Sequence, residues 1–178
     1  MTTMNMICTY NQWNTRKETE MKIFVKRKMW MESALAEEPD FFKGCAVISI
    51  NEPYTCSPLT KQDCKYSLFL HFYDITNEAE GYRAGITRPI MFDKEDAKKV
   101  IDFLDEIKKA DVKELYIHCH AGFSRSAAVG TFANNYYHWG DDMHAWQAFY
   151  RENDTMRPNH WVLEKLVEEY EWRQMQCL

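Results

Sequence analysis

A strand that leads almost directly into a helix is the feature of this sequence that most constrains its fold. Residues 112–118 (VKELYIH) have the composition of a strand, and residues 126–138 form a helical stretch. The segment HCHAGFSR folds tightly between them. Strands that alternate with helices form mainly parallel sheets covered on both faces. The sequence therefore predicts an α/β fold with a mainly parallel central sheet flanked by helices.

The rest of the chain continues this alternation. Apolar runs predict further strands from Met21 (MKIFVKR), over 45–50 (CAVISI) and over 65–73. Helical patterns cover residues 30–38, 141–151 and a stretch from about Asn159 onward. A further helix follows Asp93, which is a good N-cap, and its apolar residues share one face: Ala97, Val100, Ile101, Leu104 and Ile107. Residues 75–92 lack a sustained period and predict a long loop, and such loops are often functional.

Length and composition predict one folded domain. The chain has 178 residues, 46% of them hydrophobic and 28% charged, which excludes disorder of the whole chain. Residues 1–20 are polar and aperiodic, so we expect a flexible N-terminal segment followed by a domain over 21–178. We expect this domain to be a monomer.

Charge and cysteine content limit the partners and the compartment. The net charge of −5 provides no basic field for nucleic acid or an anionic membrane surface. No secretory leader and no run of about 18 apolar residues occurs, so no membrane association is expected. The six cysteines lack the spacing of a disulfide scaffold or a metal knuckle, which indicates reduced thiols in the cytoplasm.

The junction between the strand and the helix has the residues of a phosphate site. Five residues separate Cys119 from Arg125. Backbone N–H groups at such a junction point inward, and with the helix dipole they form a cradle for an anion. The same field lowers the pKa of a cysteine thiol from about 8.5, which makes Cys119 a nucleophile. The predicted phosphate-binding residues are His120, Ala121, Gly122, Phe123, Ser124 and Arg125.

The residue types in this segment fit that chemistry. The planar guanidinium of Arg125 can hold two phosphate oxygens at once, which a lysine cannot do. Gly122 supplies the permissive backbone of a tight turn. The hydroxyl of Ser126 can hydrogen-bond the sulfur of Cys119 when the thiolate leaves. His118 can orient the loop by forming hydrogen bonds to the backbone of the loop.

Residues 118–126 (HCHAGFSRS) resemble the signature loop of protein tyrosine phosphatases in its dual-specificity form. In outline the resemblance covers residues 21–172 and includes Arg157-Pro158-Asn159 before the last helix. It implies a two-step phosphoryl transfer through Cys119, with no metal or organic cofactor. It also implies a phosphorylated protein substrate, with phosphotyrosine as the main target and phosphoserine or phosphothreonine as further ones.

The resemblance also implies a general acid, usually an aspartate on a loop that follows a strand. We predict Asp74, which ends the strand-like run Phe72-Tyr73-Asp74. It lies 45 residues before Cys119, a longer interval than is usual in the family, and no Trp-Pro-Asp tripeptide is present. Asp93 is the alternative, although its role as a helix cap already explains it.

Several residues have two interpretations from sequence alone. Asn159 either positions the attacking water, as the resemblance suggests, or caps the final helix. Arg83 and Arg88 either approach the substrate or are solvated surface residues. His118 and His120 beside Cys119 do not predict a metal site, because adjacent strand residues point to opposite faces. Cys56 and Cys64 are interpreted as ordinary surface or core thiols.

Three other functions stay open at this point. RNA 5′-triphosphate and phosphoinositide phosphatases share the Cys-x5-Arg geometry, but no lysine lies between residues 119 and 125, and the acidic charge disfavours RNA. A phosphate-binding module with little turnover is an alternative from a different class. A sulfurtransferase of the rhodanese type fits the His-Cys-x-x-Gly-x-x-Arg-Ser pattern less well.

Overall fold

The computed structural model describes residues 21–138 and 143–176. The predicted flexible segment, residues 1–20, lies outside the described residues, as do Cys8 and Cys177. None of the described helices is long and apolar enough to cross a bilayer.

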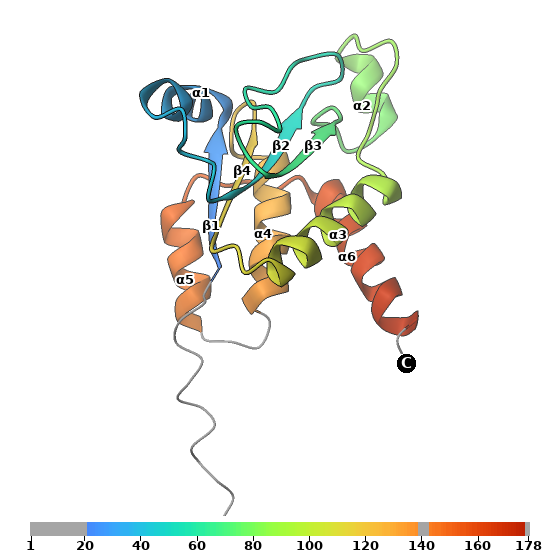
Figure 1. Cartoon of the computed structure of the whole chain (residues 1–178). Helices are drawn as coiled ribbons and strands as arrows, with labels where there is room; N and C mark the ends of the chain where they lie inside the picture. Colours follow the sequence, from blue (N-terminus) through green and yellow to red (C-terminus); the bar gives the residue numbers. More distant parts are fainter. Residues whose placement is uncertain (1–20, 139–142, 177–178) are drawn as a thin grey trace, which may run out of the picture.

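Four parallel strands form the central sheet (Figure 1). They are β1 (Lys22–Arg27), β2 (Ala46–Asn51), β3 (Tyr66–His71) and β4 (Glu114–Cys119), and their spatial order is β1-β4-β2-β3. Strand β4 pairs in parallel with both β1 and β2, so it lies inside the sheet. The predicted α/β fold with a parallel sheet is confirmed, and the carboxyl ends of all strands lie at one edge.

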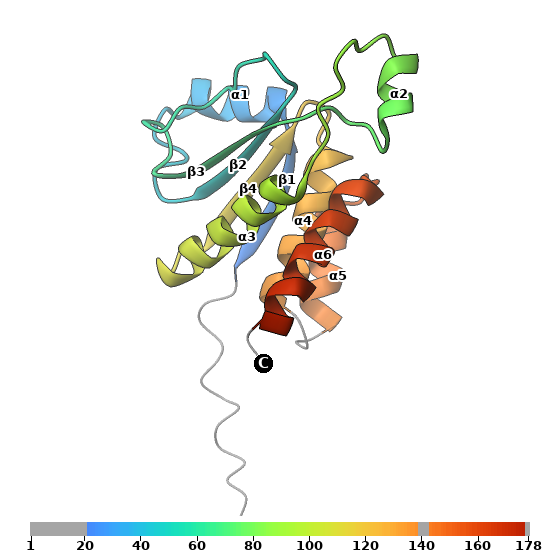
Figure 2. The same ribbon diagram turned by 90° about the vertical axis from the view of Figure 1, so that its right-hand side faces the viewer.

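Helices cover both faces of this sheet (Figure 2). One face packs against α1, and the other packs against α3, α4 and α6, with α5 beside α4 and β1. The bounds are α1 (Lys28–Glu37), α2 (Glu78–Arg83), α3 (Lys94–Lys109), α4 (Arg125–His138), α5 (Met143–Glu152) and α6 (His160–Gln176). Residues 141 and 142 of the helix predicted over 141–151 lie outside the described residues.

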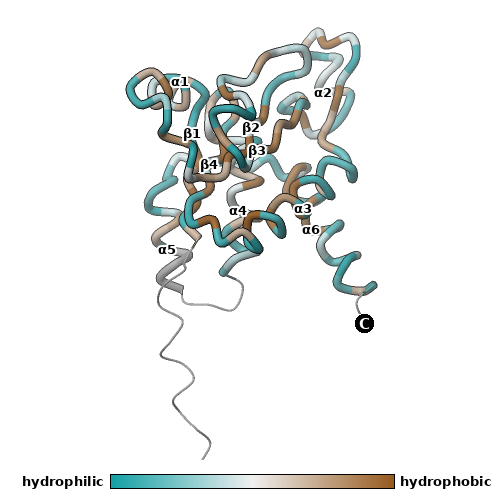
Figure 3. The backbone as a smooth tube through the Cα atoms, in the orientation of Figure 1, coloured by the Kyte–Doolittle hydropathy of each residue, from teal (hydrophilic) through white to brown (hydrophobic). Residues whose placement is uncertain are grey.

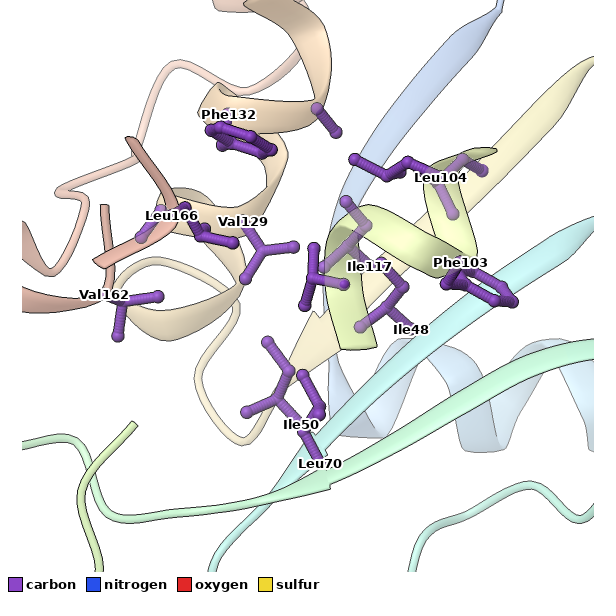
Figure 4. Packing of buried hydrophobic residues seen from close by; sticks show 14 of the residues in the cluster. Ile48, Ile50, Leu70, Phe103, Leu104, Ile117, Val129, Phe132, Val162 and Leu166 are labelled. Carbon is purple, nitrogen blue, oxygen red and sulfur yellow. The ribbon is translucent and has the colours of Figure 1, made fainter. Parts of the chain in front are cut away.

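The strand residues alternate between the two faces with period two. Ile48 and Ile50 of β2 and Ile117 of β4 point toward α3, α4 and α6, as Figure 4 shows. The five apolar residues predicted on one face of α3 are all buried there. Figure 3 shows hydrophobic residues concentrated where the strands meet these helices. Because Cys119 lies two residues after Ile117, its side chain is on this same face.

The opposite face holds a smaller core of aromatic rings under α1. Tyr116 of β4 stacks on Trp30 with ring centroids 5.7 Å apart, and Phe42 packs edge-on against the same tyrosine. Met31 of α1 is fully buried there. Position 118 faces this side of the sheet, so His118 and Cys119 point in opposite directions, as the strand period requires.

The segment 75–92 is not the uniform loop that its composition predicts, because residues 78–83 form α2. Asn77 caps this helix by accepting a hydrogen bond from the amide of Glu80 at 2.9 Å. The Glu80 carboxylate in turn accepts one from the amide of Thr76 at 2.7 Å. This reciprocal capping stabilises a helix of six residues, which is too short to show a hydrophobic period.

Candidate active site

The loop between β4 and α4 places Cys119 and Arg125 at the carboxyl edge of the sheet. Cys119 is the last residue of β4 and is 1% exposed, and Arg125 is the first residue of α4 and is 3% exposed. The loop is held from both sides. The amide of Lys28 donates to the carbonyl of His120, and the amide of Arg157 donates to the carbonyl of Phe123. The loop is therefore fixed before any ligand binds.

Two groups converge on the sulfur of Cys119. The amide of Gly122 donates to Sγ at 3.2 Å, and the hydroxyl oxygen of Ser126 lies 3.1 Å from Sγ. An ionised sulfur accepts hydrogen bonds of this kind better than a thiol does. Ser126 therefore lies within hydrogen-bonding distance of the sulfur, as its predicted role requires.

Other backbone amides of the loop have no protein acceptor. Within residues 21–138 and 143–176, five of them donate no hydrogen bond: the amides of His120, Ala121, Phe123, Ser124 and Arg125. A row of unpaired amides at a helix N-terminus matches an oxyanion in charge and geometry. The loop can therefore bind a phosphate group next to Cys119.

Gly122 allows the loop to close against β1. Its φ is +81°, in the left-handed region that favours glycine. A Cβ at this position would lie 2.7 Å from the amide nitrogen of Arg27 and 2.8 Å from the carbonyl carbon of Lys26. These are backbone atoms of the β1 to α1 junction, which cannot move aside without disturbing the sheet. The tight turn thus requires glycine for two independent reasons.

We expect Gly122→Ala to lower the free energy of unfolding by at least about 2 kcal/mol, because the left-handed backbone and the backbone clash both oppose a Cβ. Gly44→Ala is the matched control, since a Cβ there meets no atom within 4 Å. Urea unfolding of both variants measures the difference. Equal stabilities of the two variants would contradict the close approach of the loop to β1.

Arg125 is fixed by contacts from two neighbouring strand ends. Its Nη1 donates to the carbonyl of Phe72 at 2.8 Å, and its Nη2 lies 3.7 Å from a carboxylate oxygen of Glu52. Its Nε is buried and has no hydrogen-bond partner among the described residues. A buried, unpaired donor next to the loop amides is suited to a phosphate oxygen.

Asp74 lies at the same site, although 45 residues separate it from Cys119 in the sequence. One carboxylate oxygen, Oδ1, accepts hydrogen bonds from the hydroxyl of Ser124 at 2.7 Å and from the side-chain amide of Asn159 at 2.9 Å. The other oxygen, Oδ2, is 4.0 Å from Nε of Arg125. Oδ2 is therefore the carboxylate oxygen that accepts no hydrogen bond among the described residues.

Asp93 and Asn159 both act as helix caps. Asp93 accepts a hydrogen bond from the amide of Asp96 at 2.9 Å and caps α3, as predicted. Asn159 accepts one from the amide of Val162 at 3.2 Å, so it caps α6 while it also contacts Asp74. The hydrogen bond from Val162 confirms the capping interpretation of Asn159, and its role toward water stays a prediction.

His118 is fully buried on the α1 side of the sheet, and this burial lowers the pKa of its imidazole to about 4. The ring lies near the backbone of Cys119, which favours the charged form. That contact is not a well-formed hydrogen bond, because neither ring nitrogen has a hydrogen-bond partner among the described residues. The ring is therefore neutral at pH 7.

We expect this histidine to make the fold acid-sensitive. Because the imidazole takes up its proton more readily in the unfolded chain, acidification from pH 6.5 toward pH 4 favours unfolding. The expected loss in the free energy of unfolding is on the order of 3 kcal/mol. His118→Gln, which does not titrate, should lack this part of the loss. Urea unfolding at pH 7 and pH 4 tests it, and equal losses in both proteins would refute it.

The remaining predicted site residues lie at the surface. His120 is exposed, and the ring of Phe123 is 44% exposed beside the loop. Arg83 donates to the carbonyl of Ala79 within α2 and does not contact the cradle. No cluster of three or more metal-ligating side chains occurs in the described part of the chain. Cys45, Cys56 and Cys64 are free thiols, and burial raises the pKa of Cys45 to about 12 and that of Cys64 to about 11.

Glu52 is the site residue that sequence reasoning missed. It directly follows β2, so its carboxylate reaches the edge of the sheet where Arg125 lies. The signal was available, because the carboxyl ends of neighbouring parallel strands meet at one edge. The sequence alone did not say that β2 is the neighbour of β4.

Comparison with known proteins relies on structure, because no protein-family model and no curated sequence matches this chain. The structure of PTPMT1 in complex with PI(5)P matches with a TM-score of 0.52 at 18% identity, over 88% of this chain and 95% of that one. Human DUSP28 matches with a TM-score of 0.51 at 19% identity, over 86% and 94%.

A third structure has a name that points away from catalysis. The human tyrosine phosphatase-like serine/threonine/tyrosine-interacting protein matches with a TM-score of 0.51 at 21% identity, over 89% of this chain and 99% of that one. At these identities the comparisons establish the fold and leave the activity to be argued from the site.

Proposed function

From the premise that this chain has the fold of the compact, dual-specificity protein tyrosine phosphatases, we propose that it is a protein phosphatase. Its substrate is phosphotyrosine in proteins, with phosphoserine and phosphothreonine as further targets, and the reaction passes through a cysteinyl-phosphate. The observation that carries the proposal is the convergence of Cys119, the buried unpaired donor of Arg125 and Asp74 at one loop of free amides.

In the first step, the thiolate of Cys119 attacks phosphorus in line with the leaving oxygen. The loop amides and Arg125 hold the other phosphate oxygens and stabilise the charge that they carry in the transition state. Asp74 donates its proton from Oδ2 to the leaving oxygen, so the alcohol departs neutral. The products are a phosphorylated Cys119 and the dephosphorylated side chain.

In the second step, water attacks the phosphorus of the cysteinyl-phosphate. Asp74, now ionised, takes a proton from the water, and the thiolate of Cys119 leaves. The hydroxyl of Ser126 and the amide of Gly122 stabilise the departing sulfur, because both lie within 3.2 Å of it. Inorganic phosphate is released and the enzyme returns to its starting state.

The proposal needs no metal or organic cofactor, because Cys119 supplies the nucleophile and Arg125 the positive charge. It places the protein in the cytoplasm, where thiols are kept reduced. We propose that it acts as a monomer, since each residue of the mechanism comes from one chain.

Hydrolysis in EDTA tests the proposal. The purified protein should hydrolyse p-nitrophenyl phosphate and a phosphotyrosine peptide at similar rates with and without the chelator. A folded protein that hydrolyses neither compound, nor a phosphoserine peptide, would overturn the proposal and favour a phosphate-binding module. Such a module is the alternative that the phosphatase-like interacting protein suggests.

A phosphoinositide substrate is the second candidate, because one structural neighbour is a complex with PI(5)P. The cradle of this chain has one buried cation, Arg125, and no lysine between residues 119 and 125. A headgroup with several phosphates would find few cations to neutralise it there. Soluble inositol phosphates in the same assay distinguish the two substrates.

A further inference from the structure

A pocket of about 470 Å³ lies beside the loops that follow β2 and β3. Its lining residues are Tyr54, Tyr73, Gly85, Ile86, Thr87 and Arg88. Tyr73 directly precedes Asp74, and Tyr54 follows two residues after Glu52. Both loops that contribute these tyrosines also contact Arg125, through the carbonyl of Phe72 and the carboxylate of Glu52. The pocket is therefore built on the same two loops that contact Arg125.

The third wall of the pocket comes from residues 85–88, which follow α2. Figures 1 and 2 both show α2 and this loop at the end of the molecule where the carboxyl ends of β2 and β3 lie. This segment belongs to the 45-residue interval between Asp74 and Cys119 whose length is unusual for the fold family.

The segment is anchored rather than loosely attached. The amide of Tyr73 donates to the carbonyl of Ile90 at 2.8 Å, which ties its end to the loop of Asp74. Gly81 of α2 is buried against Pro89, so closely that a Cβ there would lie 2.9 Å from the proline ring. The indole of Trp161 donates to the carbonyl of Phe92 at 2.9 Å. Arg88 is therefore held next to the pocket by contacts on both sides of it.

The lining is mixed, with aromatic and aliphatic side chains beside polar groups and one unpaired positive charge. The ring of Tyr54 is 85% exposed, and Ile86 adds an aliphatic wall. Arg88 is exposed and forms no ion pair or hydrogen bond with another residue in the described part of the chain. A ligand that suits this lining has an apolar stem and one negative charge, as an acidic side chain does. A single cation does not match a chain of several phosphates.

We propose that this pocket binds a residue that flanks the phosphorylated one in a peptide substrate, with Arg88 pairing to an aspartate or glutamate. Tyr54 and Ile86 cover the aliphatic part of that residue. The inference rests on the proposed function, because the phosphate in the cradle places the peptide over the pocket. The net charge of −5 gives acidic peptides no general attraction to this protein, so the preference has to come from a local cation.

Peptide binding to Cys119→Ser tests the pocket without turnover. Fluorescence anisotropy would compare phosphotyrosine peptides that carry glutamate at each of the two positions before and after the phosphotyrosine with matched glutamine peptides. We expect one glutamate position to tighten binding about three- to fivefold, as for a partly exposed ion pair. In the double variant Cys119→Ser/Arg88→Ala, the glutamate and glutamine peptides should bind with equal affinity. Arg83→Ala, an exposed arginine outside the pocket, should keep the preference for glutamate.

Three outcomes would overturn the inference. The protein could show no preference for glutamate over glutamine at any position, or it could keep that preference in the Arg88→Ala variant. Arg88→Ala could also weaken the binding of the glutamate and glutamine peptides equally. The kcat/KM values of the catalytic protein for the same peptides should follow the same ratios. Failure of the proposed function gives a different result, because it abolishes hydrolysis of p-nitrophenyl phosphate, which carries no flanking residue.

Discussion

Replacing Cys119 by serine is expected to lower kcat for p-nitrophenyl phosphate by about 10⁴-fold or more. A serine hydroxyl at this position is far less ionised than a thiol and has no adjacent general base, so it is a poor nucleophile. The substitution is nearly isosteric, and the amide of Gly122 and the hydroxyl of Ser126 can still hydrogen-bond the new oxygen. The variant should therefore unfold at about the same temperature as the original protein.

A second measurement separates loss of the nucleophile from loss of the site. Rapid acid quenching with a radiolabelled substrate should trap a phosphorylated protein in the original chain and none in Cys119→Ser. The variant should still bind inorganic phosphate, because the loop amides and Arg125 are unchanged. Residual activity within tenfold of the original, with no trapped intermediate in either protein, would contradict covalent catalysis by Cys119.

The cradle could be predicted from the sequence because its parts are adjacent in the chain. The strand period places Cys119 on the face opposite His118, and the start of α4 fixes Arg125 six residues later. Gly122 follows from the tight turn between them. Each of these inferences depends on local backbone geometry, which a short sequence segment largely determines.

The contacts of Asp74 could not be predicted in the same way. They join residues that lie 50 and 85 positions apart in the chain, Ser124 and Asn159. Which strands are neighbours decides whether such residues meet, and an apolar run does not specify its neighbour in the sheet. The same reason explains why Glu52 was missed. Helix α2 was missed for a different reason, because its stability comes from capping by Asn77 and Glu80 and from packing rather than from a hydrophobic period.

The loop of Asp74 is held in place by donors that do not titrate. Ser124 and Asn159 both donate to Oδ1, which leaves Oδ2 to carry the exchangeable proton. An asparagine at position 74 can accept the same two hydrogen bonds through its own oxygen. Asp74→Asn therefore removes the proton donor while it leaves the loop anchored, which makes it a cleaner test than alanine.

We expect Asp74→Asn to lower kcat for a phosphotyrosine peptide by about 10²- to 10³-fold, the range typical of a lost general acid. The loss should be smaller for p-nitrophenyl phosphate, because nitrophenolate leaves without protonation far more readily than the tyrosine phenolate does. KM should stay constant or fall, since the change removes a negative charge that lies 4.0 Å from Arg125.

Asp93→Asn is the matched control for this variant. Asparagine caps helices as well as aspartate does, so α3 should be unaffected and kcat should stay within about twofold. If Asp93→Asn lost activity and Asp74→Asn kept it, the acid would have to come from the start of α3, and the loop of Asp74 would only anchor Arg125. If both variants kept full activity on the peptide, the leaving oxygen would be protonated by solvent. The free carboxylate oxygen beside Arg125 would then serve to position the guanidinium.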